Sequence, residues 1–189
     1  MKSAMDGQPG LSIPAIQSER LELAWMSPAF IVASLDGRRD AAGALIDAIV
    51  PEEWPDERAR RPPWGLGGRL EQMQRDPAES PWLLRAMIAR ADRAMVGRIN
   101  FHGRPNEWGQ AELGYTVFPA HRQRGYATEA ALAMMGWARH HHDVRRFLLS
   151  ISPDNAPSLR VAAKLGFVRI GVQMDEIDGE EYVFELIQP

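Results

Sequence analysis

A run of basic residues that ends in a glycine has the composition of an anion-binding turn. His121, Arg122 and Arg124 precede Gly125, and an amphipathic helical pattern begins directly after it. The first turn of a helix presents unpaired backbone N–H groups and the positive end of the helix dipole, which favour a bound phosphate. Gly125 and Ala127 leave space for phosphate oxygens to approach the backbone. The pattern therefore predicts a phosphate site, although many turns with one Gly and one Arg bind nothing.

Two elements must hold this turn in place. Residues 112–118 alternate Leu113, Tyr115 and Val117, which predicts a strand with one face in the core. Residues 126–141 carry apolar side chains at the i, i+3, i+4, i+7 spacing of an amphipathic helix. The turn therefore joins the end of a strand to the start of a helix.

Similar patterns predict the rest of the sheet and its helices. The apolar segment 145–152 predicts a buried strand parallel to residues 112–118, because a crossover helix lies between them. Two such strands that splay apart would open a wedge for an extended ligand. Further strands are expected at residues 19–25, 82–89, 94–102, 167–177 and 180–187, and further helices at residues 28–35, 41–50, 66–75 and 157–165.

The expected fold class is α/β (α+β), with a twisted, mainly antiparallel sheet, one splayed parallel strand pair and helices on both faces. Residues 1–18 are expected to form an N-terminal extension and residues 19–189 a single domain. Residues 52–81 are rich in Trp, Pro, Gly and mixed charge, which predicts an irregular insert. This insert either caps the core or contacts the substrate.

Composition narrows the class of protein. The 189 residues are 45% hydrophobic and include no cysteine, so a core can form without disulfides, and a reducing cytoplasm is the expected location. The net charge of −3 argues against nucleic acid as the main partner. No apolar run is long enough for a membrane span, and residues 1–18 lack the pattern of a signal peptide. The three histidines at residues 140–142 point in different directions on a helix, so no metal is expected.

Two motifs together resemble the GNAT N-acetyltransferase superfamily. Arg122, Gly125 and Ala127 fill the acetyl-CoA loop R/Q-x-x-G-x-G/A, whereas neither a P-loop nor a dinucleotide-binding turn is present. Residues 155–158 and 164–167 resemble the N-x-x-S…K-x-G-F segment that follows in this superfamily. The Ser of N-x-x-S makes the chain most similar to the ribosomal-protein N-terminal acetyltransferase (RimJ/RimL-type) subgroup.

This resemblance implies acetyl-CoA as the acetyl donor. Its pantetheine arm would lie along the edge of the strand at residues 115–117 as an added strand, and its pyrophosphate would lie in the basic turn. Asn155 would hold the cofactor or a water through its amide. The cofactor-binding residues implied in this way are Tyr115, Thr116, Val117, Arg122, Gln123, Arg124, Gly125, Tyr126, Ala127, Thr128 and Asn155.

The resemblance also implies catalytic roles. The Val117 backbone N–H would stabilise the developing oxyanion, and Glu112 would act as the base, with His102 as an alternative. Many family members have a tyrosine as the acid two residues before the Lys of the second motif, but this chain has Ala162 there. Ser158 is then the candidate that protonates or hydrogen-bonds the CoA sulfur. Ordinary structural roles for Glu112 and Ser158 remain open.

The function predicted from these features is direct transfer of an acetyl group to a primary amine, either a protein N-terminus or a small amine. The alternative is a catalytically silent acyl-CoA-binding sensor or interaction module. A homodimer is possible, and neither a membrane nor a nucleic-acid partner is expected. Acceptor recognition is expected within residues 27–81, where Glu52, Glu53 and Trp54 suit a cationic amine, although a solvated acidic loop is the alternative.

Overall fold

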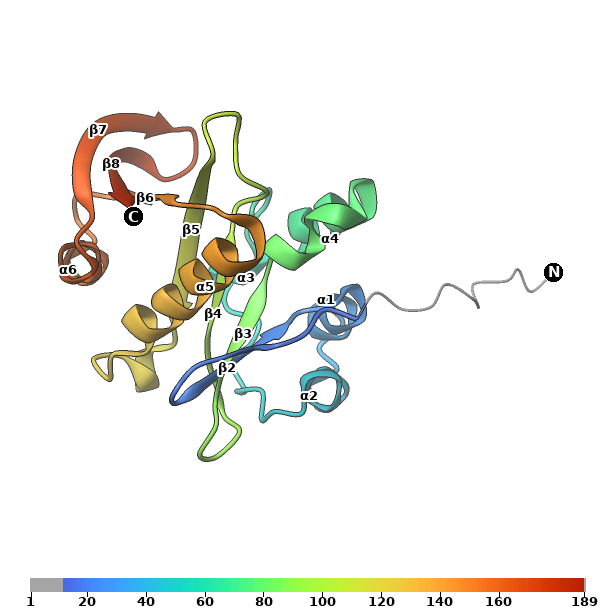
Figure 1. Ribbon diagram of the computed structural model, residues 1–189. Helices are drawn as coiled ribbons and strands as arrows, with labels where there is room; N and C mark the ends of the chain where they lie inside the picture. The colour runs from blue at the N-terminus through green and yellow to red at the C-terminus, as the bar shows by residue number, and fades with distance from the viewer. Residues whose placement is uncertain (1–11, 189) are drawn as a thin grey trace.

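The computed structural model of the chain describes residues 12–188. Figure 1 shows a twisted central sheet with helices packed on it. The sheet contains eight strands in the order β1-β2-β3-β4-β5-β6-β8-β7, and only β5 and β6 are parallel neighbours within this described sheet. The predicted mainly antiparallel sheet with one parallel pair is therefore confirmed. The strands are β1 Ile16–Gln17, β2 Leu21–Trp25, β3 Arg85–Ala89, β4 Met95–Phe101, β5 Gln110–Val117, β6 Arg146–Ile151, β7 Val168–Asp175 and β8 Gly179–Ile187.

Helices cover both faces of the sheet, as predicted. The α5 and α6 helices bury Met134, Met135 and Ala162 against one face, while helices α1 to α4 bury Phe30, Leu66 and other apolar side chains against the opposite face. The helices are α1 Pro28–Leu35, α2 Arg39–Ile46, α3 Glu57–Arg60, α4 Leu66–Arg75, α5 Tyr126–His142 and α6 Ala156–Leu165, with 3-10 turns η1 Pro77–Trp82 and η2 Pro119–His121.

The β5 and β6 strands separate after a short parallel ladder. Their register pairs only residues 110–112 with residues 146–148, yet β5 continues to Val117 and β6 to Ile151. Beyond this ladder, one edge of β5 therefore faces a gap rather than a neighbouring strand. The predicted splay is present, and it positions the site described below.

The insert at residues 52–81 packs more tightly on the core than its composition suggests. Trp54 is buried between Phe30 and Phe118, with ring centroids 6.2 and 5.9 Å away, and its indole N–H donates to Ser34 at 2.9 Å. This residue therefore stabilises the core, while the α3 and α4 helices extend toward the gap between β5 and β6.

The other departures from the sequence predictions have local causes. The expected N-terminal extension, residues 1–18, lies partly outside the described residues, and its last part forms β1, which pairs with β2. Trp82 ends the η1 turn instead of beginning a strand. The α2 helix ends earlier than expected because Asp47 adopts a left-handed conformation, with φ of 48°. A bulge lies at Val96, where the register between β3 and β4 shifts by one residue.

Candidate active site

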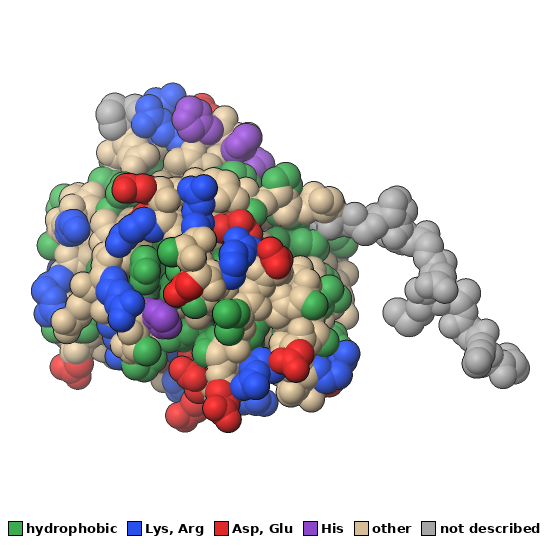
Figure 2. Space-filling view, turned by 90° about the horizontal axis from the view of Figure 1, so that it is seen from below, with side chains coloured by type: hydrophobic (Ala, Val, Ile, Leu, Met, Phe, Trp, Pro, Cys, Tyr) green, Lys and Arg blue, Asp and Glu red, His purple; other side chains and the backbone are tan. Residues whose placement is uncertain are grey.

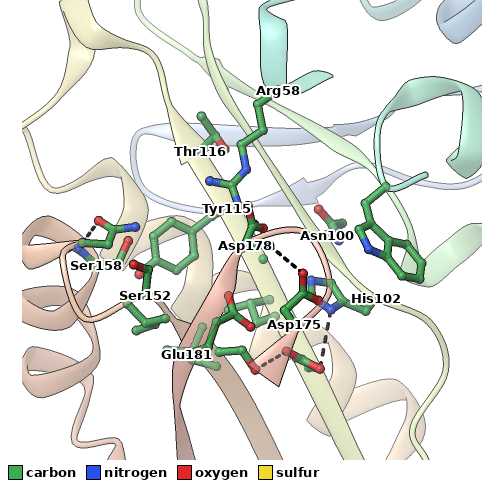
Figure 3. Close-up of a pocket in the computed structure, with 18 of the residues that line it drawn as sticks. Arg58, Asn100, His102, Tyr115, Thr116, Ser152, Ser158, Asp175, Asp178 and Glu181 are labelled. Atoms are coloured by element: carbon green, nitrogen blue, oxygen red, sulfur yellow. Dashed lines mark hydrogen bonds and ion pairs between the residues drawn. The ribbon is translucent and has the colours of Figure 1, made fainter. Parts of the chain in front are cut away.

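A cavity of about 900 Å³ opens where β5 and β6 separate, and Figure 3 shows the side chains that surround it. Five parts of the chain build most of its walls: β4 with the following His102, β5, β6 with the start of α6, the α3–α4 segment, and the β7–β8 hairpin. The residues that line the cavity include Arg58, Arg61, Arg69, Arg98, Asn100, His102, Glu112, Gly114, Tyr115, Thr116, Ser150, Asn155, Ser158, Gln173, Asp178 and Glu181.

Backbone hydrogen bonds fix the direction in which each residue of β5 faces. The Phe118 N–H donates to the Val96 carbonyl across the β4–β5 ladder. Because hydrogen-bonded positions alternate in an antiparallel ladder, Thr116 also turns its backbone toward β4. The N–H groups of Tyr115 and Val117 therefore point the opposite way, toward the gap. These two residues offer a free strand edge, whereas Thr116 reaches the cavity only through its side chain.

The basic turn after β5 leaves a row of backbone donors unpaired. None of the N–H groups of residues 123–128 donates to another carbonyl within residues 12–188. Gln123 and Gly125 adopt left-handed conformations, with φ of 62° and 82°, which bend the chain into the 17-residue α5 helix. Gly125 is the N-cap and makes no side-chain cap, so the free end of a long helix faces outward. This geometry suits the predicted phosphate site.

Arg20 completes this turn, and the sequence patterns did not identify it. Its guanidinium donates to the Arg124 carbonyl at 3.0 Å and pairs with the Glu129 carboxylate at 2.7 Å. It also stacks over the Tyr126 ring, 5.0 Å from the centroid. A Cβ atom added at Gly125 would lie 3.4 Å from Arg20 Nη2. The turn therefore carries a further positive charge, contributed from just before β2.

The predicted turn residues differ in how they are held. Arg122 folds back so that its Nε donates to the Val117 carbonyl at 3.1 Å, which ties the turn to the end of β5. Gln123 and Arg124 are exposed, and Tyr126, Ala127 and Thr128 lie half-buried in the first turn of α5. Val117 is not among the residues lining the cavity. It lies between the cavity and the turn, at the join of the two parts of the site.

Glu112 and His102 form a pair on the cavity wall. Glu112 Oε2 lies 3.5 Å from His102 Nδ1, and Glu112 Oε1 accepts a 2.6 Å hydrogen bond from the Ser150 hydroxyl. Burial raises the pKa of Glu112, but His102, Ser150 and the positive charge of Arg69 together lower it by more, so the pKa lies below its ordinary value. Glu112 is consequently ionised at neutral pH and holds the imidazole by its Nδ1 side.

Gly114 makes room for this imidazole. A Cβ atom at Gly114 would lie 2.9 Å from His102 Nε2, closer than side chains normally approach. The glycine therefore lets the ring lie across β5, with Nε2 close to the strand that leads to the gap. The sequence motifs treated Gly114 only as part of a strand.

A buried phenol lies across the cavity from this pair. The Tyr115 side chain points toward Ser158 (Figure 3), and its hydroxyl makes no hydrogen bond within the described part of the chain. Burial raises the pKa of the Tyr115 phenol, and the nearby Ser158 hydroxyl offsets part of that rise. The phenol therefore keeps its proton at neutral pH. The sequence resemblance predicts only a cofactor-binding role for Tyr115.

Asn155 has a structural task in addition to the one expected. Its Oδ1 accepts a 3.2 Å hydrogen bond from the Ser158 N–H and so caps α6. Only its amide N–H groups remain available to a ligand, although the residue lines the cavity.

The α3–α4 segment forms one wall of the cavity, but not with the residues expected from the sequence. Trp54 does not line the cavity, because it is buried in the core. Arg58 and Arg61 instead reach across to Asp178 on the β7–β8 hairpin, at 3.1 and 3.2 Å. The prediction of a Trp54 contact with the amine was therefore wrong, although residues 27–81 do contribute to the wall.

Surface charge and metal ligands add little to this site. On the face shown in Figure 2, basic and acidic side chains are interspersed. Within residues 12–188, no three His, Cys, Asp or Glu side chains form a group able to hold a metal ion. Over the same residues, no helix combines the length and the apolar character that crossing a bilayer requires.

Sequence comparison identifies a family. Residues 42–168, more than half of the chain, match the family described as "Acetyltransferase (GNAT) domain". The "Uncharacterized N-acetyltransferase YjdG" of Bacillus subtilis (strain 168) is 32% identical over 87 residues, which cover 46% of this chain and 50% of that protein. The chain spans about half the length of the curated relatives it matches.

Solved structures share the fold at lower identity. The ribosomal-protein-S5-alanine acetyltransferase from Vibrio fischeri has a TM-score of 0.63 at 15% identity, covering 93% of this chain and 99% of that one. The microcin C7 self-immunity acetyltransferase MccE was solved with acetyl-CoA and AMP. It has a TM-score of 0.63 at 15% identity, and the match covers 90% of this chain and 94% of that one. At such identities the likeness establishes only the fold. With the family match and the observed sheet, the chain belongs to the GNAT acetyltransferase domain family.

Proposed function

We propose that this protein is an acetyl-CoA-dependent N-acetyltransferase that moves an acetyl group directly to a primary amine. One observation carries the proposal: the unpaired edge of β5 connects the free N–H groups of the α5 turn to the Glu112–His102 pair. Membership of the GNAT family supports acetyl transfer in general. MccE, which shares the fold, was solved with acetyl-CoA.

The donor site fits the chemistry of acetyl-CoA. The free N–H groups of residues 123–128 would bind the pyrophosphate, with positive charge from Arg20, Arg122 and Arg124 nearby. The backbone N–H and C=O groups of Tyr115, together with the Val117 C=O, would bind the amides of the pantetheine arm as an added strand. The Thr116 side chain and the Asn155 amide would complete these contacts.

We assign the proton acceptor to the Glu112–His102 pair rather than to Glu112 alone. A carboxylate with a lowered pKa is a weak base toward an ammonium group, whereas imidazole is the side chain that most often acts as a general base in enzymes. Glu112 would hold His102 by Nδ1 and stabilise the imidazolium that forms when Nε2 takes the amine proton. Glu112 keeps an essential role as the group that positions the base.

Groups on the gap side would stabilise the transition state. The Val117 N–H, which faces the gap, would donate to the acetyl oxygen as negative charge develops on it. The leaving thiolate needs a proton, and Ser158 was the candidate from the sequence motif. The buried Tyr115 phenol lies beside Ser158, retains its proton and has no competing partner among the described residues, so we propose Tyr115 as the acid.

The acceptor is proposed to be a protein N-terminus or a small primary amine. Fold similarity to the ribosomal-protein-S5-alanine acetyltransferase supports the RimJ/RimL-type subgroup as the nearest functional model. The amine would enter from the face of the sheet that carries the α3–α4 segment, where His102 and Glu112 lie.

Incubation with acetyl-CoA and a panel of peptides and small amines tests this proposal. Release of CoA together with an acetylated amine, identified by mass spectrometry, is the expected result. Saturable acetyl-CoA binding with no acetylated product from any amine would favour the silent sensor instead.

A further inference from the structure

Two arginines on the cavity wall are buried and only incompletely paired. Arg98, from β4, is only 7% exposed, and its nearest carboxylate oxygen, on Asp56, lies 3.8 Å away. Within residues 12–188 its guanidinium makes no hydrogen bond, and its only other contact of note is with the Trp54 ring, 5.9 Å from the centroid. A guanidinium carries five N–H donors, so its capacity to bind an anion is unused.

Arg69, from α4, lies close to Arg98 and is 4% exposed. One Nη donates to Gln72 and to the His102 carbonyl, but Nε has no partner within the described part of the chain. Burial, followed by repulsion from Arg98, lowers the pKa of Arg69 to about 10, so it remains charged at neutral pH. Two buried positive charges thus face one cavity.

Arg85 shows how this chain treats an arginine that only supports the fold. It is fully buried, but its guanidinium donates to the carbonyls of Pro14, Leu23 and Pro81, and it does not line the cavity. Buried charges normally acquire such partners. Arg98 lacks them on the side of the protein where a substrate enters.

The other arginines of the cavity already have a close carboxylate partner. Arg58 and Arg61 both pair with Asp178 of the β7–β8 hairpin. Among the cavity arginines, Arg98 and Arg69 therefore lack a carboxylate at hydrogen-bond distance within the described residues.

The sheet places this charge beside the proposed base. Arg98 pairs in register with Thr116, and side chains two apart on a strand share a face, so Arg98, Asn100 and His102 line one side of the cavity. Arg69 also bonds the His102 carbonyl. A substrate whose amine lies at His102 would have its remaining atoms directed along β4 toward Arg98.

We infer that the acceptor carries a carboxylate or phosphate group near its amine and that Arg98, supported by Arg69, binds this anion. The inference rests on the proposed function, because it specifies the substrate of the same site. The acidic residues Glu52 and Glu53 suggested a purely cationic acceptor. The inferred site instead requires an acceptor that carries both a positively charged amine and an anion. An amine without an anion would displace water from Arg98 without replacing the hydrogen bonds of that water, so the same residue would also disfavour amines that lack an anion.

Matched pairs of amines test the inference: phosphoethanolamine against ethanolamine, β-alanine against β-alaninamide, and an Asp-Gly amide against an Asn-Gly amide. Equilibrium binding is measured by thermal shift with CoA present, and turnover by CoA release. In at least one pair the charged member should bind at least about tenfold more tightly, as expected for charge-assisted hydrogen bonds. The pair with the larger difference separates phosphate from carboxylate recognition.

Variants separate anion binding from structural support. Arg98→Gln should remove the preference for the charged member, Arg98→Lys should keep part of it, and Arg104→Gln should keep all of it, because Arg104 is exposed outside the cavity and pairs with Asp76. Arg98→Met should leave the melting temperature unchanged or raise it, because it removes a buried charge that makes no hydrogen bond and whose nearest carboxylate oxygen, on Asp56, lies 3.8 Å away. A marked loss of melting temperature in that variant would indicate a structural role and overturn the inference.

The binding assay requires no turnover, so the two proposals fail separately. Equal binding within every pair, no binding of any charged amine, or a preference that survives Arg98→Gln would overturn the inference. Acetylation of neutral amines as efficiently as charged ones would also overturn it while leaving the transferase intact. Preferential binding without acetylation would support the anion site and contradict the transferase.

Discussion

The Arg20 guanidinium and the Glu129 carboxylate lie 2.7 Å apart and join the start of β2 to the first turn of α5, across 109 residues of sequence. The same carboxylate accepts hydrogen bonds from the Arg20 N–H and the Ser18 hydroxyl. A segment just before the sheet therefore holds the proposed phosphate turn in place. Arg20 stabilises the turn and places its guanidinium, paired with Glu129, beside it.

We predict that Arg20→Gln weakens acetyl-CoA binding about tenfold, because a charge-assisted contact and the support of the turn are both lost. Isothermal titration of acetyl-CoA measures the change. Arg38→Gln is the control, since Arg38 is exposed and pairs with Asp36. Equal affinity in Arg20→Gln and the wild type would show that the phosphates bind elsewhere.

The Arg20–Glu129 pair should also give the protein a defined sensitivity to acid. Burial raises the pKa of Glu129, but the hydrogen bonds from Arg20 and Ser18 lower this pKa by a larger amount. The net shift is therefore downward from an ordinary value of 4.5. A group with a lowered pKa in the folded state contributes stability above its unfolded pKa and loses it as the pH falls through the folded pKa.

Urea denaturation at several pH values below about 5 measures this contribution. Wild type should be more stable than Glu129→Gln at neutral pH, and the difference should shrink as the pH falls below 4.5. A difference that stays constant down to the lowest pH would show that Glu129 ionisation does not stabilise the fold.

For the proposed base, His102→Ala and Glu112→Gln should each lower kcat by roughly 10²–10⁴-fold, the usual cost of losing general-base catalysis. Acetyl-CoA affinity should stay near wild type in both, because neither residue contacts the phosphate turn. The double variant should be little worse than either single variant, since the two side chains act as a unit. Additive losses would indicate independent roles.

Gly114→Ala tests the same arrangement without removing a functional group. The new methyl would displace the imidazole, because its carbon would lie 2.9 Å from His102 Nε2. We expect a lower kcat with unchanged acetyl-CoA affinity and little change in melting temperature. Full activity in this variant would remove His102 Nε2 from the reaction.

Tyr115→Phe should lower kcat more than Ser158→Ala if the phenol protonates the leaving thiolate. Because the hydroxyl has no hydrogen-bond partner among the described residues, its loss should not lower the melting temperature. The defect should shrink with an acetyl thioester whose thiol is more acidic, since that leaving group needs less protonation. The reverse order of the two variants would return the acid role to Ser158.

Local patterns in the sequence predicted most of the fold and the donor turn. The alternation in residues 112–118 and the helical spacing in residues 28–35 and 157–165 each depend on neighbouring residues alone, so they can be recognised without tertiary contacts. The observed α4 helix matches its predicted bounds for the same reason.

The remainder of the site depends on contacts between distant segments, which local patterns do not encode. Arg20 reaches the turn from more than a hundred residues away, and His102 meets Glu112 only because β4 and β5 pair in one register. Trp54 resembled a ligand-binding aromatic in the sequence, but it is buried by Phe30 and Phe118. For Arg98, no feature of the sequence distinguishes an arginine on the surface from a buried one whose guanidinium makes no hydrogen bond within the described residues.

The central claim is that one site binds acetyl-CoA at the α5 turn and transfers its acetyl group to an amine at His102. The most direct test measures CoA release and the acetylated amine together, for wild type and for Gly125→Val, with an amine panel that includes the charged and neutral pairs. Wild type should form equal amounts of both products, and Gly125→Val should form neither, because its side chain would block the turn at a φ of 82°. CoA released without any acetylated amine, or full transfer by Gly125→Val, would contradict the account.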